Sequence, residues 1–174
     1  SGIHHAFKNY FIVAGVRVEA AEREVSCWSQ PLLKHEGLGL AGFLCADIGG
    51  ILHFLVQAKP EPGIVGSVEL GPTVPIFDYH ARADLVGKVP FLEYFLEPPG
   101  EAQVLHSSIQ SEEGGRFWNL CNQFVVLELP DYRAIKHPER YEWMTLEQLQ
   151  RFSQGESMVN SEARTLLSCL QYFH

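Results

Sequence analysis

Two apolar runs that meet at a Gly-Gly pair constrain the fold of this chain more than any other sequence feature. Residues 39–47 and 51–59 are rich in aliphatic and aromatic side chains, and Ile48-Gly49-Gly50 joins them. Because glycine adopts positive φ readily, a Gly-Gly pair between two strand-like runs is a strong signal for a tight turn. The sequence therefore predicts that the two runs are paired strands of one β-hairpin.

Further strands are expected on both sides of this hairpin. The other strand-like runs are 9–18, 67–74 with an interruption at Gly71-Pro72, and the pair 104–111 and 117–129 around Gly114-Gly115. Each run is enriched in β-branched and aromatic residues and is bounded by turn residues. Most connections are short, which favours antiparallel or mixed sheet.

Helices are expected mainly in the last third of the chain. A capping-box pattern, Thr145 with Gln148, predicts a helix over 145–152, and 161–171 predicts a terminal helix capped by Asn160 or Ser161. Residues 78–96 are ambiguous because Gly87 and Pro90 interrupt a helical spacing, and the polar stretch 130–143 predicts an exposed loop. We therefore expect one α+β domain over 1–174.

Composition narrows the possible partners and compartment. The 174 residues are 46% hydrophobic and carry a formal net charge of -8, which argues against nucleic acid or an anionic membrane as the main partner. No apolar run approaches the roughly 20 residues that span a bilayer, and no secretory signal pattern is visible. The four cysteines are widely spaced, which favours free thiols in a reducing cytoplasm.

Several common chemistries lack their sequence motifs. The chain has no P-loop, no GxGxxG, no HExxH or Cys/His metal spacing, and no GxSxG elbow. The remaining candidates are carboxylates, histidines and amides, which suit proton transfer without a cofactor or a metal. We therefore expect neither a cofactor nor a bound metal ion.

The densest polar cluster lies at residues 108–117, SIQSEEGGRF. In a strand, Gln110 and Glu112 share one face, while Glu113 lies on the other. The two glycines would let backbone N–H groups approach a ligand closely. A charged hairpin turn with a surface pair between a glutamate and Arg116 explains the same pattern equally well.

Three further clusters contain candidate site residues. His53 and Gln57 share a strand face in HFLVQAKPEPG, residues 53–63, although a satisfied sheet histidine explains His53 as well. Lys59 lies in the same run and is also compatible with a surface loop. Glu69 precedes the Gly71-Pro72 bend. Arg23, Trp28 and Gln30 could hold a base and a diphosphate, with a plain core role for Trp28 as the alternative.

These clusters, in this order, resemble the nucleotide-diphosphohexose 2,3-dehydratase family. The matching stretches are Arg23-Glu24-Val25 with Trp28, Gln30-Pro31-Leu32-Leu33, and the runs 53–63, 68–74, 110–117 and 159–167. The resemblance implies a Nudix hydrolase-like fold used without Nudix metal chemistry. Family members carry two such modules and tend to dimerise, so the chain resembles one module and a homodimer is expected.

The resemblance also implies a reaction. Family members remove water across C2 and C3 of a nucleotide-linked 4-keto-6-deoxyhexose, usually the dTDP form, in deoxysugar and antibiotic biosynthesis. On this reading Glu112 or Glu113 is the base and Glu69 or His53 the proton donor. Gln57 and Gln110 are expected to contact substrate oxygens. Arg23, Lys59 or Arg116 is expected to bind the diphosphate. Trp28, which lies close to Gln30 in the sequence, is expected to stack on the nucleotide base.

Two other functions stay open at this stage. The chain could be a non-catalytic module that binds a nucleotide sugar or mediates dimerisation. It could also be a half-size relative that dehydrates or isomerises another natural-product intermediate.

Overall fold

A computed structural model describes residues 2–4, 11–35, 37–64, 66–76, 85–154 and 158–170. The strands are β1 (Gly2–His4), β2 (Ile12–Glu19), β3 (Cys27–Lys34), β4 (Leu38–Ile48), β5 (Ile51–Pro60), β6 (Val68–Gly71), β7 (Val74–Ile76), β8 (Gln103–Ser111), β9 (Phe117–Trp118), β10 (Cys121–Glu128) and β11 (Tyr141–Thr145). The α-helices are α2 (Leu92–Leu96), α3 (Leu146–Gln154) and α4 (Ser161–Leu170), and η1 (Tyr132–Ala134) is a short 3₁₀ turn.

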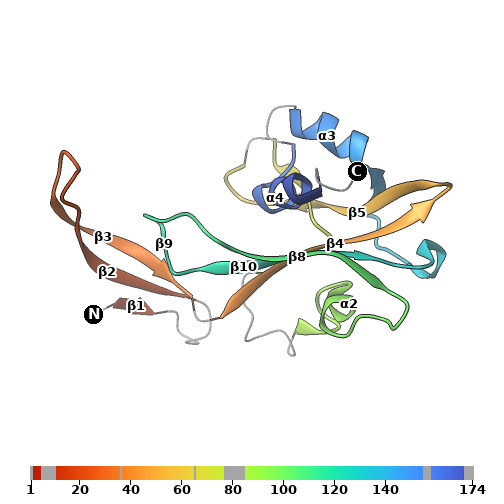
Figure 1. The fold of residues 1–174 in the computed structure, drawn as a ribbon, viewed down its shortest axis with the longest axis horizontal. Coiled ribbons are helices and arrows are strands. Elements are labelled where there is room, and N and C mark those ends of the chain that lie inside the picture. Colours follow the sequence, from red (N-terminus) through yellow and green to blue (C-terminus); the bar gives the residue numbers. More distant parts are fainter. Residues whose placement is uncertain are drawn as a thin grey trace.

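The strands form two sheets that lie end to end. The larger sheet has the order β11-β5-β4-β10-β8, with β6 paired to β5 and β7 to β4, and the smaller has the order β1-β2-β3-β9. Figure 1 shows β2 and β3 as a ribbon at one end of the molecule, away from the helices. The two-residue strand β9 runs parallel to the end of β3 and links the smaller sheet to the start of β10.

The predicted central hairpin is confirmed. Strands β4 and β5 pair antiparallel, and Gly49 and Gly50 both have positive φ, 67° and 85°. The Asp47 side chain accepts a hydrogen bond of 2.8 Å from the Gly50 N–H and closes the turn. Beside this hairpin β10 runs parallel to β4 and antiparallel to β8, so the sheet is mixed.

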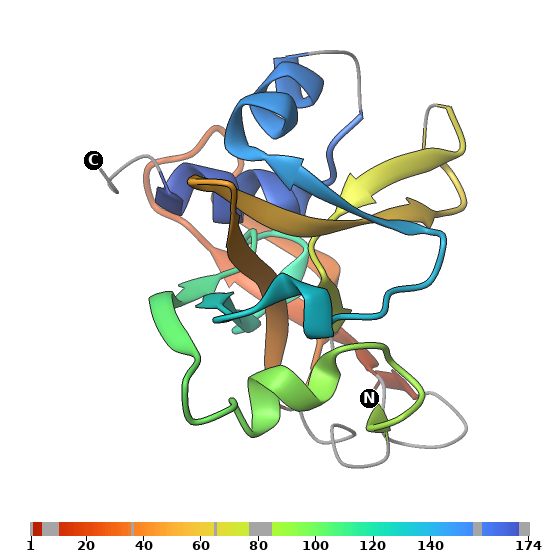
Figure 2. The same ribbon diagram turned by 90° about the vertical axis from the view of Figure 1, so that its right-hand side faces the viewer.

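Two hydrophobic layers cover the larger sheet, one on each face. Side chains of β4, β5 and β10 such as Phe43, Phe54 and Val126 pack with α3 and α4. The alternate side chains pack with α2 and the segment around Tyr141. Figure 2 shows α3 and α4 on one side of the sheet and α2 on the other.

The predicted helix starts are confirmed. Gln148 N–H donates to the Thr145 hydroxyl at 3.2 Å, and Thr145 N–H donates to the Gln148 side-chain oxygen at 2.8 Å, which is a reciprocal capping box. The Asn160 side chain caps α4 by accepting from Ala163 N–H at 2.9 Å. Asn160 is therefore the cap among the two candidates.

Two segments differ from the sequence prediction. The stretch 130–143, expected as an exposed loop, contains η1 and the start of β11, and Tyr141 is 2% exposed. The run 117–129, expected as one strand, is two strands, because Asn119 between β9 and β10 has a φ of 51°. Residues 5–10 and 77–84 lie outside the described part of the chain, and with them the start of run 9–18 and part of 78–96.

Candidate functional site

The half-buried carboxylate Glu112 lies where β8 ends. Its N–H donates to the Leu120 carbonyl at 2.9 Å, which extends the pairing with the β10 side by one residue. Its side chain accepts a hydrogen bond from the Asn122 side-chain amide. The next four residues, 113–116, lead to β9, and we call residues 112–116 the Glu112 loop. The carboxylate is thus held by a group from the neighbouring strand.

Asn122 is the residue of this site that the sequence reasoning missed. It is 3% exposed, and its side-chain oxygen has no hydrogen-bond partner among the described residues. A buried amide oxygen without a partner is uncommon in folded proteins. The available signal was an asparagine on the same strand face as the apolar Phe124 and Val126.

A polar strip on β8 continues from this pair. Gln110 is the cross-strand neighbour of Asn122. Its amide donates to the Ser108 hydroxyl at 3.2 Å and to the Cys169 sulfur at 3.4 Å, and the His106 ring lies 2.9 Å from the same hydroxyl. Gln110 and Glu112 were expected to share one face, and Asn122 of β10 lies beside them.

Glu113 and Arg116 lie on the surface of the Glu112 loop. Their side chains are 73% and 68% exposed, and the closest nitrogen and oxygen are 4.0 Å apart. An exposed pair at this distance contributes little to stability. Of the two adjacent glutamates, Glu112 is the one held inside the structure.

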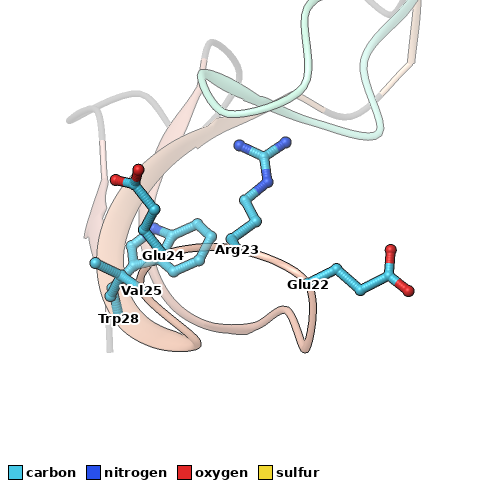
Figure 3. A pocket seen from close by; sticks show the side chains of 5 residues that line it. All are labelled: Glu22, Arg23, Glu24, Val25 and Trp28. Atoms are coloured by element: carbon cyan, nitrogen blue, oxygen red, sulfur yellow. The ribbon is translucent and has the colours of Figure 1, made fainter.

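A second group of predicted residues lies at the turn between β2 and β3. A cavity of about 630 Å³, here called the hairpin pocket, is lined by Glu22, Arg23, Glu24, Val25 and Trp28. Figure 3 shows the Arg23 guanidinium extending from the turn, apart from the two carboxylates, with the Trp28 ring beside it. A cation and an indole face in one cavity are suited to a phosphate and a planar base.

Gln30 connects the hairpin pocket to the Glu112 loop. Its side-chain oxygen accepts from Trp28 Nε1 at 2.6 Å, and its side-chain nitrogen donates to the Gly115 carbonyl at 2.6 Å. Leu33 N–H also donates to the Arg116 carbonyl, at 2.8 Å. The structure therefore brings Arg23, Trp28, Gln30, Gln110, Glu112, Glu113 and Arg116 into one region.

The remaining candidates lie on two strands, with His53, Gln57 and Lys59 on β5 and Glu69 on β6. Strands β4 and β10 separate β5 from β8, so at a spacing of about 4.8 Å these strands are roughly 14 Å apart. The buried Gln57 amide donates to the Pro72 carbonyl at 3.0 Å, and the His53 ring contacts the Ile51 carbonyl at 2.9 Å. Both contacts are to backbone carbonyls of the protein and fit a structural role.

Lys59 and Glu69 also lie in this distant group. They are cross-strand neighbours, and the Lys59 amine forms an ion pair of 3.0 Å with Glu61. Glu69 lines a separate groove of about 430 Å³ whose other walls are mostly apolar, including Met144, Phe152 and Met158. The structure does not bring these residues to the Glu112 loop.

Among the other titratable groups in the described part of the chain, the thiol of Cys45 is buried. Burial raises the pKa of the Cys45 thiol well above its usual range, and the Glu128 carboxylate acts in the same direction. That thiol lies in the core and is protonated at neutral pH, so it is a poor nucleophile. Within the described residues, no group of three or more His, Cys, Asp or Glu side chains is arranged to hold a metal ion. No helix in the described part is long and apolar enough to cross a membrane.

Comparison of the sequence with known proteins gives a consistent picture. A family model described as NDP-hexose 2,3-dehydratase matches residues 1–170. Two curated proteins described as dTDP-4-dehydro-6-deoxy-alpha-D-glucopyranose 2,3-dehydratase are similar over 97% of this chain. The one from Streptomyces violaceoruber is 43% identical and the one from Amycolatopsis orientalis 37% identical. The chain spans only 38% and 35% of their respective lengths.

Comparison of the structure bears on the fold. An ADP compounds hydrolase superposes with a TM-score of 0.58 and 15% identity, over 99% of this chain and 91% of that one. A Nudix hydrolase from M. smegmatis, RenU, gives a TM-score of 0.49 at 14% identity, over 91% of this chain and 94% of that one. The expected α+β, Nudix hydrolase-like fold is confirmed.

Proposed function

This chain belongs to the NDP-hexose 2,3-dehydratase family, and on that premise we propose that it removes water across C2 and C3 of a nucleotide-linked 4-keto-6-deoxyhexose. The observation that carries the proposal is the Glu112 carboxylate, half-buried and held by the Asn122 amide beside Gln110. A positioned carboxylate next to amide groups is the minimum that proton abstraction beside a carbonyl needs.

Glu112 acts as the base in this proposal. The C4 ketone acidifies the C3 proton, which passes to the Glu112 carboxylate while the C3–H electron pair moves into the enolate. In this proposal backbone N–H groups near Gly114 stabilise the charge that develops on the C4 oxygen. A positioned acid–base group of this kind typically contributes about 10²- to 10⁴-fold in rate.

The same glutamate returns the proton. The enolate collapses, the C2–O bond breaks, and the protonated Glu112 donates to the departing hydroxyl, which leaves as water. The product enol takes a solvent proton at C2 and becomes the 3,4-diketo sugar. Glu69 and His53, the proton donors expected from the sequence, lie on β6 and β5, so we assign this step to Glu112.

The hairpin pocket supplies the nucleotide end of the proposed site. Trp28 would stack on the base, and Arg23, with Arg116 nearby on the Glu112 loop, would hold the diphosphate. Support comes from the link through Gln30, which joins this pocket to the loop that carries the base. A dTDP-linked substrate agrees with the names of the similar proteins, which are dTDP-4-dehydro-6-deoxy-alpha-D-glucopyranose 2,3-dehydratases.

The wider setting is also proposed. A role in deoxysugar and antibiotic biosynthesis follows from the family, and the four free cysteines fit a reducing cytoplasm. A homodimer would place two copies of the fold together, as two modules of a longer chain would.

A second candidate is a module that binds a nucleotide sugar without catalysis. One observation favours it: the hairpin pocket contains the predicted binding residues Arg23 and Trp28. On this reading Glu112 and Asn122 hold the loop in place and do not move a proton.

Incubation of the chain with dTDP-4-keto-6-deoxyglucose in D₂O, followed by NMR, separates the two candidates. The dehydratase proposal predicts loss of the C3 proton signal and incorporation of one solvent deuteron at C2 of the product. Saturable line broadening of the sugar nucleotide with no chemical change would establish the binding module and overturn the catalytic proposal.

A further inference from the structure

Gln30 is expected from the sequence to touch substrate, but in the structure both ends of its side-chain amide are engaged by the protein. The oxygen accepts from the Trp28 indole N–H, and the nitrogen donates to the Gly115 carbonyl, each at 2.6 Å. We propose that Gln30 is a positioning residue that couples the ring of Trp28 in the hairpin pocket to the backbone of the Glu112 loop. The proposal rests on the proposed function of both ends.

The geometry of β3 allows one side chain to reach both places. Trp28 and Gln30 are two residues apart in a strand, so their side chains leave the same face and lie next to each other. Gly115 is 85 residues further along the chain, and only the parallel pairing of β3 with β9 brings it close. The contact is therefore a property of the tertiary fold.

The Glu112 loop is attached at both ends and contacted in the middle by Gln30. At its start, Glu112 N–H donates to the Leu120 carbonyl, and at its end the Arg116 carbonyl accepts from Leu33 N–H. Between these points Gly115 adopts a φ of 90°, a conformation that favours glycine. The Gln30 amide therefore holds a loop carbonyl that lies outside the pairing of β3 with β9.

A shift of the Trp28 ring would be passed along this chain of contacts. A planar base stacked on the indole fixes the direction of its N–H, which fixes the Gln30 amide and in turn the Gly115 carbonyl. Glu112, three residues earlier on the same short loop, would be oriented best when the pocket is filled. Binding of the nucleotide would then prepare the base for the sugar, which is induced fit in its ordinary sense.

Variants at Gln30 separate its two hydrogen bonds. Gln30→Glu keeps an acceptor for the Trp28 indole but removes the donor to Gly115, whereas Gln30→Leu removes both. Trp28→Phe removes the indole donor and keeps an aromatic face. Gln103→Glu makes the same chemical change on the exposed start of β8 and is the matched control.

Solution NMR on the whole ligand-free chain tests the coupling. The three tryptophans give three indole N–H signals, and Trp28→Phe identifies the relevant one. Gln30→Leu should speed solvent exchange of that proton about twofold to tenfold, the usual effect of one net hydrogen bond. It should also shift the Gly115 and Arg116 amides. Gln30→Glu should shift those amides while the indole exchange stays slow, and Gln103→Glu should change neither.

Titration with dTDP then tests two claims separately: the coupling through Gln30 and the binding of a nucleotide in the hairpin pocket. In the wild-type chain the Trp28 indole and the loop amides should respond with one Kd, and in Gln30→Leu only the indole should respond. A loop response of wild-type size in Gln30→Leu, or ligand-free loop amides that ignore both Gln30 variants, would overturn the coupling. A wild-type Trp28 indole that ignores dTDP, with the ligand-free coupling intact, would instead refute the nucleotide role of the hairpin pocket.

Discussion

At the scale of single residues, Asn122 determines how Glu112 is presented. Its amide nitrogen donates to the carboxylate, and its oxygen is buried with no hydrogen-bond partner among the described residues. An ionised carboxylate only accepts hydrogen bonds, so its contact with Asn122 fixes which side of that amide faces it. The Asn122 side-chain oxygen therefore lacks a partner because the charged Glu112 carboxylate requires the amide nitrogen to face it.

Asn122→Ala should therefore affect both activity and folding. Removal of the donor leaves a half-buried carboxylate less well satisfied, which typically lowers stability by about 1–3 kcal/mol. If Glu112 is the base, the rate of water loss should also fall, because the carboxylate is no longer held in one position. Urea unfolding and the rate of conversion of dTDP-4-keto-6-deoxyglucose measure the two effects.

Gln123→Ala is the matched control for Asn122→Ala. Gln123 is the next residue on β10, on the opposite face, and makes one exposed contact of 3.4 Å with Ser107. Its removal should leave both the unfolding curve and the rate of water loss close to wild type. A folded Asn122→Ala variant that converts the sugar at the wild-type rate would refute the positioning role of Asn122.

The cysteines provide a test of burial at the same scale. Cys27 is exposed, whereas Cys45 is buried and its pKa is raised by burial and by Glu128. A thiol reagent near pH 8 should therefore modify Cys27 rapidly and Cys45 only on unfolding. Because the folded-state pKa of Cys45 is raised, its contribution favours folding below the pKa of an unfolded cysteine, about 8.5, and weakens as pH rises above it. Rapid labelling of Cys45 in the folded chain would contradict the packing of β4.

At the scale of elements, the sequence predicts correctly those turns and helix starts that depend on residues close together in the chain. The β4–β5 turn, the Thr145–Gln148 box and the α4 cap follow from residues within a few positions of one another. Strand β3 escaped prediction because Pro31 interrupts its pattern, and proline usually marks an edge or the absence of a strand. Here Pro31 lies opposite Gly15 in an otherwise regular pair. Strand β11 was missed because its buried Tyr141 follows a polar, proline-containing stretch.

The cap of α4 gives a prediction at this scale. Asn160 is 4% exposed, accepts from Ala163 N–H, and donates its backbone N–H to the Leu70 carbonyl at 2.9 Å. Asn160→Ala should lower the free energy of unfolding by about 0.5–2 kcal/mol, as loss of an N-cap typically does. Chemical denaturation measures the change, with the exposed Ser161→Ala as a control that should leave stability nearly unchanged. Equal effects of the two substitutions would show that Ser161 shares the capping role.

At the scale of the whole molecule, the site depends on pairings that no local pattern encodes. The polar clusters around Trp28 and Glu112 are visible in the sequence, and the parallel contact of β3 with β9 brings them together (Figure 1). Glu69, His53, Gln57 and Lys59 were expected in the same site, but the strand order puts them across β4 and β10. Strand order over long separations depends on the complete core, so sequence spacing alone could not separate the two groups.

The most direct test of the account compares Glu112→Gln with Glu113→Gln in the conversion of dTDP-4-keto-6-deoxyglucose. Glutamine keeps an oxygen that can accept from Asn122, so Glu112→Gln should fold normally while the rate of water loss falls by about 10²- to 10⁴-fold. Glu113, exposed on the same loop, should tolerate the identical change at the wild-type rate. A folded Glu112→Gln variant that dehydrates the sugar as fast as the wild-type chain would contradict the account.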